Sequence, residues 1–498
     1  MSLSTIYQSY YTKSDPILDY MTGMLDFQSS ESVLEPCGGD GVFVDKILEK
    51  APSSQINILE LNPDAVSILE NKYVGFNNIS IKATDTLLDD AIVKCKVHYD
   101  KIIGNPPYGA RNDEEKKEEL NKVYPNLYTK ESYTLFLYAC INCLKEGGML
   151  SFIIPDTFLS LHRHIAIRQF ILSKTKIKEI SLFPSSYFPG VNFGYANLCI
   201  ITLEKSSDEY INFENHIKIR FGFNSVNELG KNECGETKEF VQGDVYNNIS
   251  SAFFISSSDK VNELINNPMI QRIGDIAQCV TGFYSGCDKE YLHPINAEEK
   301  NAKKYSLVPL SETYFKELTK GEKVNGIKGN CHFVPIVKGG NKKYIKPNDW
   351  FMDWSEKAVH EYRESKKCRF QNSTFYFRKY GIAIPMVRSC KLTAALIDGR
   401  LFDQSIVGVF PINEKLNNYL LAFFNSIVCT KLIAAINPST NNSANYIKKI
   451  PFLNPSKEIL ETVNKYVEKI IDKLSIGDDD IVCYEGKIDL LFEELYKL

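Results

Sequence analysis

The sequence predicts an α/β domain built on a mostly parallel sheet, followed by a second domain of mixed α+β structure. With 498 residues, the chain is longer than the roughly 250 to 300 residues that one hydrophobic core usually spans. Between about residues 30 and 204, short apolar runs alternate with segments of helix length, the pattern of parallel strands joined by crossover helices. After about residue 250 the pattern changes to short strands and turns rich in Gly, Asn and Lys. We therefore place one domain over residues 1–245 and a second over residues 246–498.

The strands expected in the first domain are its apolar runs, which are separated by segments with helical periodicity. These runs cover residues 32–36, 56–61, 79–85, 99–105, 149–155, 177–183 and 196–204. The expected helices cover residues 42–49, 63–71, 132–144 and 161–173. Residues 205–250 are polar and lack strong periodicity, so we expect a linker there. In the second domain we expect two apolar helices, near residues 416–435 and 458–474.

Positive charge is concentrated in one part of the chain. The formal net charge is −4, yet residues 301–450 carry 24 Lys and Arg against 11 Asp and Glu, a net charge of +13. A phosphate-binding surface requires such a concentration, although a solvated lysine-rich face would also produce it. Charge alone therefore leaves nucleic-acid binding and simple solvation open.

The thirteen cysteines indicate free thiols, because they are odd in number and scattered. Cys140 and Cys143 have no second pair and no nearby histidine to complete a zinc site, so we assign both to the core and expect no metal. No apolar stretch approaches the ~20 residues of a membrane-spanning helix, and the first residues lack the features of a secretory signal. We expect a cytoplasmic protein without membrane association.

Residues directly after each expected strand are informative, because open parallel sheets bind ligands beyond the carboxyl ends of their strands. The first run is followed by the turn Glu35-Pro-Cys-Gly-Gly-Asp-Gly41, whose glycines let the backbone approach a ligand. Glu60 follows about 20 residues later, where an acidic side chain can accept both hydrogens of a ribose diol. Asp85 can accept from an adenine amino group. Each acidic residue alone is more often a turn or helix cap, but in this order they predict a nucleoside pocket.

The fourth run leads into Asn105-Pro-Pro-Tyr108, which decides between possible ligands. The glycines are not followed by the lysine of a P-loop, and NAD is compatible with the pocket but has no use for this tetrapeptide. An exocyclic amine is a poor nucleophile unless its lone pair is held toward the electrophile. The Asn105 side-chain oxygen and the Pro106 carbonyl can each accept one N–H, and Tyr108 offers a flat face for a base. The alternative is a double-proline turn that merely ends a strand.

These motifs resemble the gamma-class adenine-N6 DNA methyltransferases of the TaqI type. The resemblance rests on Tyr11-Thr12, the turn from Glu35 to Gly41, Glu60, Asp85, Asn105 to Tyr108 and the Phe188-Pro189 region, and it covers about residues 8–205. It implies a class I, Rossmann-like methyltransferase domain with S-adenosyl-L-methionine as cofactor. It also implies that residues 246–498 form a target-recognition domain for double-stranded DNA.

The resemblance assigns individual roles. Tyr11, Thr12 and Glu35 would hold the methionine part of the cofactor, while Glu60 and Asp85 would hold its ribose and adenine. Phe136 would pack on the cofactor adenine, and Phe188, with Phe193 as the competitor, would stack on an extruded base opposite Tyr108. The full set of expected site residues is Asn105, Pro106, Pro107, Tyr108 and Phe188 for catalysis, with Tyr11, Thr12, Glu35, Pro36, Gly38, Gly41, Glu60, Asp85, Asn105 and Phe136 for the cofactor. Individual glycine roles stay open, because Cys37 and Gly38-Gly39-Asp40-Gly41 match the family's looser turn only in outline.

Basic residues of the second domain are candidates for DNA contact, since Arg and Lys bind phosphates and guanine edges. We name Lys289, Lys342, Lys343, Arg378, Lys379 and Arg388. Two other functions are kept open: the same chemistry on RNA or on a protein glutamine, and a catalytically silent DNA-binding specificity module. A fused nuclease is not expected, because Pro155-Asp156 has no Glu-x-Lys at a useful distance. A separate cognate restriction endonuclease is a possible partner.

Overall fold

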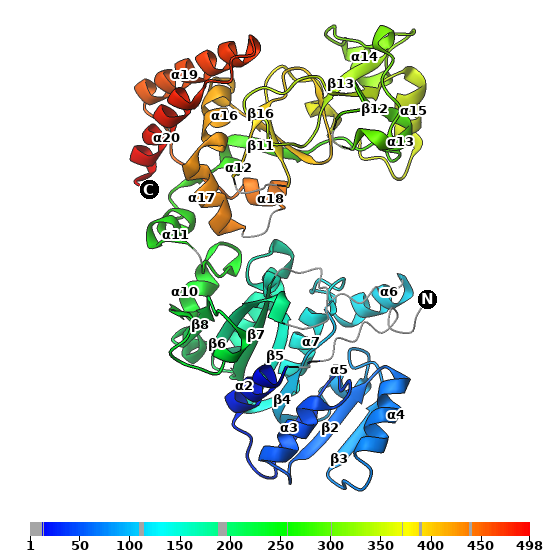
Figure 1. Cartoon of the computed structure of the whole chain (residues 1–498), viewed down its shortest axis with the longest axis vertical. Helices are drawn as coiled ribbons and strands as arrows, with labels where there is room; N and C mark the ends of the chain where they lie inside the picture. Colours follow the sequence, from blue (N-terminus) through cyan, green and yellow to red (C-terminus); the bar gives the residue numbers. More distant parts are fainter. Residues whose placement is uncertain are drawn as a thin grey trace. The chain divides into compact units, whose positions relative to one another are not determined.

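The computed structural model of the protein describes residues 12, 14–108, 114–187, 197–255, 257–299, 301–370, 372–387, 391–437 and 441–498. The chain forms two compact units, Met1–Ile255 and Ser256–Leu498, and passes from one to the other once (Figure 1). This division lies after Ile255, whereas the sequence suggested residue 245. The two units are described separately below.

One nine-stranded sheet organises the first unit, in the order β3-β2-β1-β4-β5-β7-β6-β8-β9. Its strands are β1 (Ser32–Glu35), β2 (Gln55–Glu60), β3 (Ile79–Ala83), β4 (Tyr99–Gly104), β5 (Leu144–Pro155), β6 (Thr175–Pro184), β7 (Asn197–Lys205), β8 (His216–Phe221) and β9 (Glu236–Val241). The strands from β3 to β5 pair in parallel, and β7 runs antiparallel to both β5 and β6. Every apolar run expected from the sequence forms a strand. The predicted α/β fold with a mostly parallel central sheet is confirmed.

Helices cover both faces of this sheet. They are α2 (Asp15–Leu25), α3 (Val42–Lys50), α4 (Pro63–Lys72), α5 (Asp90–Val93), α6 (Glu114–Val123), α7 (Ser132–Asn142), α8 (Ile165–Lys174), α9 (Glu209–Phe213) and α10 (Gln242–Asn247), with 3₁₀ turns at Asp156–Leu159, His162–His164, Ser185–Tyr187, Val226–Glu228 and Ile249–Ser251. Phe152, Ile153 and Ile154 of β5 are consecutive and each 0% exposed. Successive strand residues point to opposite faces, so both faces are packed. Cys140 and Cys143 lie in this core, as expected.

The expected linker over residues 205–250 was wrong. That segment contains β8 and β9, which extend the sheet beyond β6. In β8 the apolar residues alternate with polar ones, and Ile217 and Ile219 are both fully buried. An alternation this short, flanked by Asn, Glu and Lys, gives too weak a periodic signal to separate from a polar loop.

The second unit contains three small sheets, in the orders β10-β19, β11-β18-β15-β16 and β12-β14-β13-β17. Its strands are β10 (Gln271–Arg272), β11 (Ala277–Thr281), β12 (Leu292–Pro294), β13 (Phe333–Val337), β14 (Trp350–Asp353), β15 (Ile382–Pro385), β16 (Ala395–Leu396), β17 (Leu401–Phe402), β18 (Ile406–Pro411) and β19 (Pro451–Phe452). An aromatic cluster around Phe283, Trp354 and Tyr362 fills the core between the four-stranded sheets. The predicted mixed α+β composition is therefore present.

Helices of the second unit are concentrated at its carboxyl-terminal end. They are α11 (Asp259–Asn266), α12 (Ile273–Ile276), α13 (Asp288–Tyr291), α14 (Lys320–Asn325), α15 (Glu356–Glu364), α16 (Asn417–Asn425), α17 (Ile427–Ile436), α18 (Ala444–Ile447), α19 (Lys457–Ser475) and α20 (Val482–Tyr496), with 3₁₀ turns at Ala302–Lys304, Leu310–Glu312, Ser373–Phe375 and Glu414–Leu416. The helix expected over residues 416–435 is two helices, because the Ser426 side chain caps α17 by accepting from the Cys429 N–H at 3.1 Å. The helix expected at 458–474 is α19.

Within the described part of the chain, no single helix is long and apolar enough to cross a membrane. One bent pair, Glu414–Asn425 with Ile427–Ile436 at 73°, has sufficient length and hydropathy when the two helices are taken together.

Candidate active site

The carboxyl ends of four neighbouring strands meet at one edge of the first unit's sheet. Because β3, β2, β1 and β4 are adjacent and parallel, the residues that end or follow them share that edge. Glu35, the last residue of β1, pairs in register with Ile58 of β2, and Glu60, the last residue of β2, pairs with Ala83 of β3. Asp85 follows β3 after one further residue, and Asn105 follows β4 directly. The strand order thus brings together residues from four separate places in the sequence.

The Gly-rich turn after β1 is held against β2 by its backbone. The Gly38 N–H donates to the Leu59 carbonyl at 3.0 Å, and the Gly41 N–H donates to the Gly38 carbonyl at 2.9 Å. A Cβ on Gly38 would lie 2.3 Å from Cγ2 of Ile58, and Gly41 has a φ of +77°. Neither position therefore accepts a side chain without strain. The turn presents backbone to the site, and α3 begins directly after it.

Glu60 is fixed by two backbone hydrogen bonds. Its Oε2 accepts from the Gly39 N–H and its Oε1 from the Asn62 N–H, both at 2.8 Å. The side chain is nearly buried, so these bonds define its orientation. Each carboxylate oxygen has a second lone pair. Glu60 can therefore hold the turn in place and still accept from a ligand.

Glu35 is a buried carboxyl group with an unsatisfied oxygen. It is 2% exposed, and among the described residues neither its Oε2 nor Oδ1 of Asp40 has a hydrogen-bond partner. Burial, followed by the negative charges of Glu60 and Asp40, raises the pKa of Glu35 well above its ordinary value. A cationic ligand beside this carboxyl group would favour its ionised form and reverse the shift.

Asp85 already has a cationic partner within the chain. Its Oδ2 lies 2.5 Å from Nζ of Lys116, which belongs to α6, and its Oδ1 accepts from the Leu87 N–H at 3.1 Å. Both charged side chains are mostly buried, at 29% exposed for Lys116 and 18% for Asp85. The residue expected to meet a cofactor adenine thus makes an ion pair in this structure.

The start of the Asn-Pro-Pro-Tyr segment packs closely on the Gly-rich turn. A Cβ on Gly104 would lie 3.3 Å from Sγ of Cys37 and 3.4 Å from Cδ of Pro36, so glycine permits the contact. The Pro36 carbonyl accepts from the Thr86 hydroxyl at 2.5 Å, which ties the loop after β3 to the same place. The ends of β1, β3 and β4 therefore form one connected structure.

The Asn105 amide is held from both sides. Its Nδ2 donates to the Thr12 hydroxyl at 3.2 Å, and its Oδ1 accepts a hydrogen bond from the Tyr108 hydroxyl. These two bonds fix the plane of the amide. The Tyr108 ring is only 2% exposed, so in this structure it does not offer the open face expected from the sequence.

The second half of the segment is attached to α7. The Pro107 carbonyl accepts from the Ser132 hydroxyl at 2.5 Å, and Ser132 is the first residue of that helix. Phe136 lies on the same helix and is 5% exposed within the first core. Because α7 is buried along most of its length, it provides a rigid support for the loop.

Some expected residues lie outside the described part of the chain: Tyr11, Phe188, Phe193 and Arg388. Sequence reasoning missed Lys116, Thr86 and Ser132. Lys116 lies in a run of alternating acidic and basic residues that is typical of a solvated helix, so no pattern marked it. Thr86 and Ser132 act through backbone carbonyls, which leave no sequence signature.

The candidate DNA-contacting residues of the second unit have different surroundings. Lys343 pairs with Glu485 at 2.8 Å, and Lys379 pairs with Glu317 at 3.0 Å. The Arg378 guanidinium stacks on Phe375 at 4.5 Å and donates to the Thr374 carbonyl and the Tyr380 hydroxyl. Lys289 and Lys342 are exposed. Lys379 is exposed as well, so the described candidates that are both exposed and outside the printed ion pairs are Lys289 and Lys342.

Comparison with known proteins relates the chain to restriction-modification methyltransferases. The Eco57I restriction-modification methylase family matches residues 44–188. The type II methyltransferase M.HindII of Haemophilus influenzae is 29% identical over 307 residues, which cover 57% of this chain and 55% of that protein. The modification methylase CviBIII of Paramecium bursaria Chlorella virus NC1A is 28% identical over 272 residues, or 51% of this chain and 65% of that protein. The chain thus spans less than two thirds of the length of either relative.

A solved structure extends the similarity of fold. The cryo-EM structure of the DrdV–DNA complex matches 94% of this chain and 57% of that chain, with a TM-score of 0.56 and 13% sequence identity. At that identity the match shows a shared fold only.

Proposed function

We propose that the chain is a DNA methyltransferase of the gamma, TaqI-like type, which transfers a methyl group from S-adenosyl-L-methionine to N6 of adenine. The observation that carries this proposal is the position of Asn105, whose amide is fixed at the carboxyl end of β4 beside the Gly-rich turn. Similarity to type II methyltransferases supports the same reaction class.

The chemistry of the nucleoside pocket fits the cofactor. S-adenosyl-L-methionine carries a sulfonium and an ammonium group. It supplies a methyl group bonded to the sulfonium sulfur, which is a good leaving group because it departs as a neutral thioether. The unpaired buried oxygen of Glu35 is suited to such a cation, because a positive charge compensates a buried carboxylate. Glu60 retains acceptor capacity for the ribose, and Asp85 is assigned to the adenine once Lys116 has moved away. Thr12, Pro36, Gly38 and Gly41 form the rest of this pocket.

The chain's own residues would activate the target amine by orientation. Asn105 Oδ1 and the Pro106 carbonyl each accept one N–H of the adenine amino group, which directs its lone pair toward the methyl group. Asn105 Oδ1 has two lone pairs, so it can accept from the base while the Tyr108 hydroxyl shifts or shares the oxygen. Attack is direct, so no cysteine is required as a nucleophile.

The target base must leave the duplex, because Asn105 and Pro106 cannot bind the amino group of a base that is still stacked and paired. Tyr108 is assigned to stacking on the extruded base, opposite Phe188. Because the Tyr108 ring is buried, base entry requires the side chains that cover it to move. That movement costs free energy, which contacts to the DNA backbone must supply.

The second unit is proposed as the target-recognition domain. Its segment over residues 301–450 carries the net charge of +13, which is suited to a phosphate backbone. We also propose a separate cognate restriction endonuclease as a partner, and a cytoplasmic location. RNA and protein glutamine are the alternative substrates, because the same pair of acceptors would orient their amino groups.

The test is transfer of labelled methyl from S-adenosyl-L-methionine to unmodified genomic DNA, with the DNA digested to nucleosides. We expect label in N6-methyladenine, and we expect the Asn105→Ala variant to lose the transfer while it still binds the cofactor. Label in a cytosine derivative would overturn the assignment of the base. Label that enters RNA or protein, with none in DNA, would overturn DNA as the substrate.

A further inference from the structure

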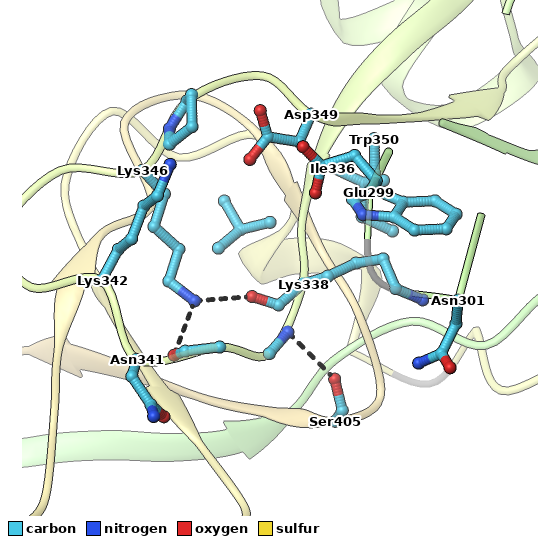
Figure 2. A pocket seen from close by; sticks show the side chains of 14 residues that line it. Glu299, Asn301, Ile336, Lys338, Asn341, Lys342, Lys346, Asp349, Trp350 and Ser405 are labelled. Atoms are coloured by element: carbon cyan, nitrogen blue, oxygen red, sulfur yellow. Dashed lines mark hydrogen bonds between the residues drawn. The ribbon is translucent and has the colours of Figure 1, made fainter. Parts of the chain in front are cut away.

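The second unit contains a cavity of about 460 Å³ beside the loop that follows β13. We call it the lysine pocket and define it by Lys338, Lys342, Lys346, Trp350, Glu299 and Asp349 (Figure 2). Figure 2 shows the Lys342 and Lys346 side chains on one side, and Asp349 and Trp350 on the other. All of these residues belong to the second unit, so the pocket is complete within it.

One side of the lysine pocket holds positive charge that makes no direct ion pair within the described residues. Nζ of Lys346 donates to the carbonyl of Lys338 at 2.8 Å and to that of Gly340 at 3.1 Å. Among the described residues, neither Lys346 nor its neighbour Arg400 makes an ion pair, although the negative charge of Asp349 acts on both. Arg400 donates instead to the Lys346 carbonyl at 2.7 Å. Burial, followed by the positive charge of Arg400, lowers the pKa of Lys346 to about 8, while the negative charge of Asp349 acts in the opposite direction.

The backbone beside these cations adds hydrogen-bond donors. The Gly339 N–H donates to the Ser405 hydroxyl at 3.3 Å, which fixes the start of the loop. The next N–H groups, from Gly340 to Lys342, donate no hydrogen bond within the part of the chain that the structure describes. Gly340 has a φ of +122°, a conformation open to glycine. Consecutive backbone N–H groups next to lysine side chains form a site for an anion with several acceptor oxygens.

The opposite side of the pocket limits where such an anion can bind. Glu299 and Asp349 are negative and would repel it. Lys338 separates the two sides: its ammonium lies 4.9 Å from the ring centroid of Trp350 and 3.5 Å from Asp403. An anion therefore fits only at the side formed by Lys342, Lys346 and the glycine loop. Its negative charge would give Lys346 the direct ionic partner that it lacks among the described residues.

We propose that the lysine pocket binds a phosphate group of the DNA backbone. The proposal rests on the proposed function for DNA as the source of the phosphate, and on the pocket alone for the phosphate chemistry. It assigns Lys342 and Lys346 to contact with the phosphate. Lys343, the adjacent candidate from the sequence, is engaged by Glu485 and is assigned no contact.

The first test is the salt dependence of duplex binding by the full chain, measured by fluorescence anisotropy at several KCl concentrations. Each lost phosphate contact lowers the slope of log K against log salt by about 0.9. We expect that decrease in Lys342→Ala, with binding about three- to tenfold weaker at low salt. Lys346→Gln should behave in the same way. Lys357→Ala is the control, because Lys357 lies on α15 and is 86% exposed. Wild-type slopes in both pocket variants would overturn the proposal.

The second test uses the position of the two tryptophans of the chain. Trp350 lines the pocket, whereas Trp354 is fully buried, so a Trp354→Phe variant reports on the pocket through Trp350 emission. We expect duplex DNA to change that emission, and the change to weaken with Lys342→Ala. A duplex whose phosphates are replaced by uncharged methylphosphonates should have no effect. If the methylphosphonate duplex instead changes Trp350 emission as much as the natural duplex does, the pocket binds a base and the phosphate assignment is overturned.

The two proposals can fail separately. Methyl transfer to DNA together with unchanged slopes would remove the phosphate site and keep the methyltransferase. If no methyl group is transferred but the salt slope still depends on Lys342 and Lys346, the phosphate site is kept and the methyltransferase is removed. If wild-type protein binds no duplex but inorganic phosphate changes Trp350 emission, DNA is overturned as the source of the phosphate.

Discussion

The Tyr108 hydroxyl donates a hydrogen bond to Oδ1 of Asn105, so the residue assigned to stacking contacts the acceptor assigned to the target amine. Removing only the hydroxyl frees that acceptor and leaves the ring. We expect Tyr108→Phe to keep kcat/KM within about threefold of wild type. Tyr108→Ala should lose roughly 1 to 3 kcal/mol of stacking, which corresponds to about 5- to 150-fold in kcat/KM. Equal losses in the two variants would show that the hydroxyl, and not the ring, matters.

Asn105 is predicted to act in the chemical step. Asn105→Ala should lower kcat by at least about 100-fold, comparable to the loss of one polar group that orients or stabilises the reacting atoms. Asn105→Asp should retain more activity, because a carboxylate accepts N–H bonds and can also accept from the Thr12 hydroxyl. The measurement is single-turnover methyl transfer at saturating cofactor. A lower affinity for the cofactor with normal turnover would contradict the assignment.

Lys116 is predicted to compete with the cofactor. Because its ammonium pairs with Asp85, this bond must break before Asp85 can accept from an adenine. Lys116→Ala should bind S-adenosyl-L-methionine up to about fivefold tighter, since a partly exposed ion pair contributes roughly 0.2 to 1 kcal/mol. Lys122→Ala on the same helix is the control. Calorimetric titration measures both, and weaker binding in Lys116→Ala would instead make Lys116 a cofactor ligand.

Glu35 is predicted to release a proton when the cofactor binds. Burial and neighbouring carboxylates raise its pKa, and a bound cation would lower it again. Calorimetric titration with the cofactor, in buffers of different ionisation enthalpy and at several pH values above the ordinary carboxyl range, should reveal proton release. Glu35→Gln should lack this release and should bind the cofactor about tenfold more weakly. Glu49→Gln is the control, because Glu49 is exposed on α3. Equal proton release in Glu35→Gln and wild type would contradict this role.

Asp156 gives a prediction for the pH dependence of stability. Burial raises its pKa from 3.8 to about 6 in the folded chain. The folded state therefore holds this proton more tightly than the unfolded state, so the contribution of Asp156 to stability is highest below about pH 4 and is lost as the pH rises through 6. Asp156→Asn should gain up to about 3 kcal/mol at pH 7.5 and little at pH 4. A gain that is equal at both pH values would exclude titration of Asp156 as the cause.

The positions of the first seven strands in the first unit could be predicted from the sequence, because buried strands and their crossover helices have clear periodicity. The sites at the strand ends followed from the same reading. Glu35, Glu60, Asp85 and Asn105 lie along one edge because parallel strands must end there. The strands β8 and β9 could not be found, since their short alternation resembles a polar loop.

Contacts made by chemically ordinary residues could not be predicted. Nothing in a run such as Glu114–Val123 distinguishes Lys116 from the other lysines, because its role depends on the position of α6 near Asp85. Burial of Tyr108 depends on packing that no local pattern encodes. In the second unit, the pairing of Lys343 with Glu485 joins residues 142 apart in sequence, so only the fold reveals that this lysine is engaged.

The chain crosses only once between its two compact units, and both of its tryptophans, Trp350 and Trp354, lie in the second. A thermal melt followed by tryptophan emission therefore reports the second unit alone. Circular dichroism and calorimetry detect both units, so they can record two transitions where emission records one, and a single Tm then does not describe the whole protein. The stability change predicted for Asp156, which belongs to the first unit, has to be measured by one of these two methods.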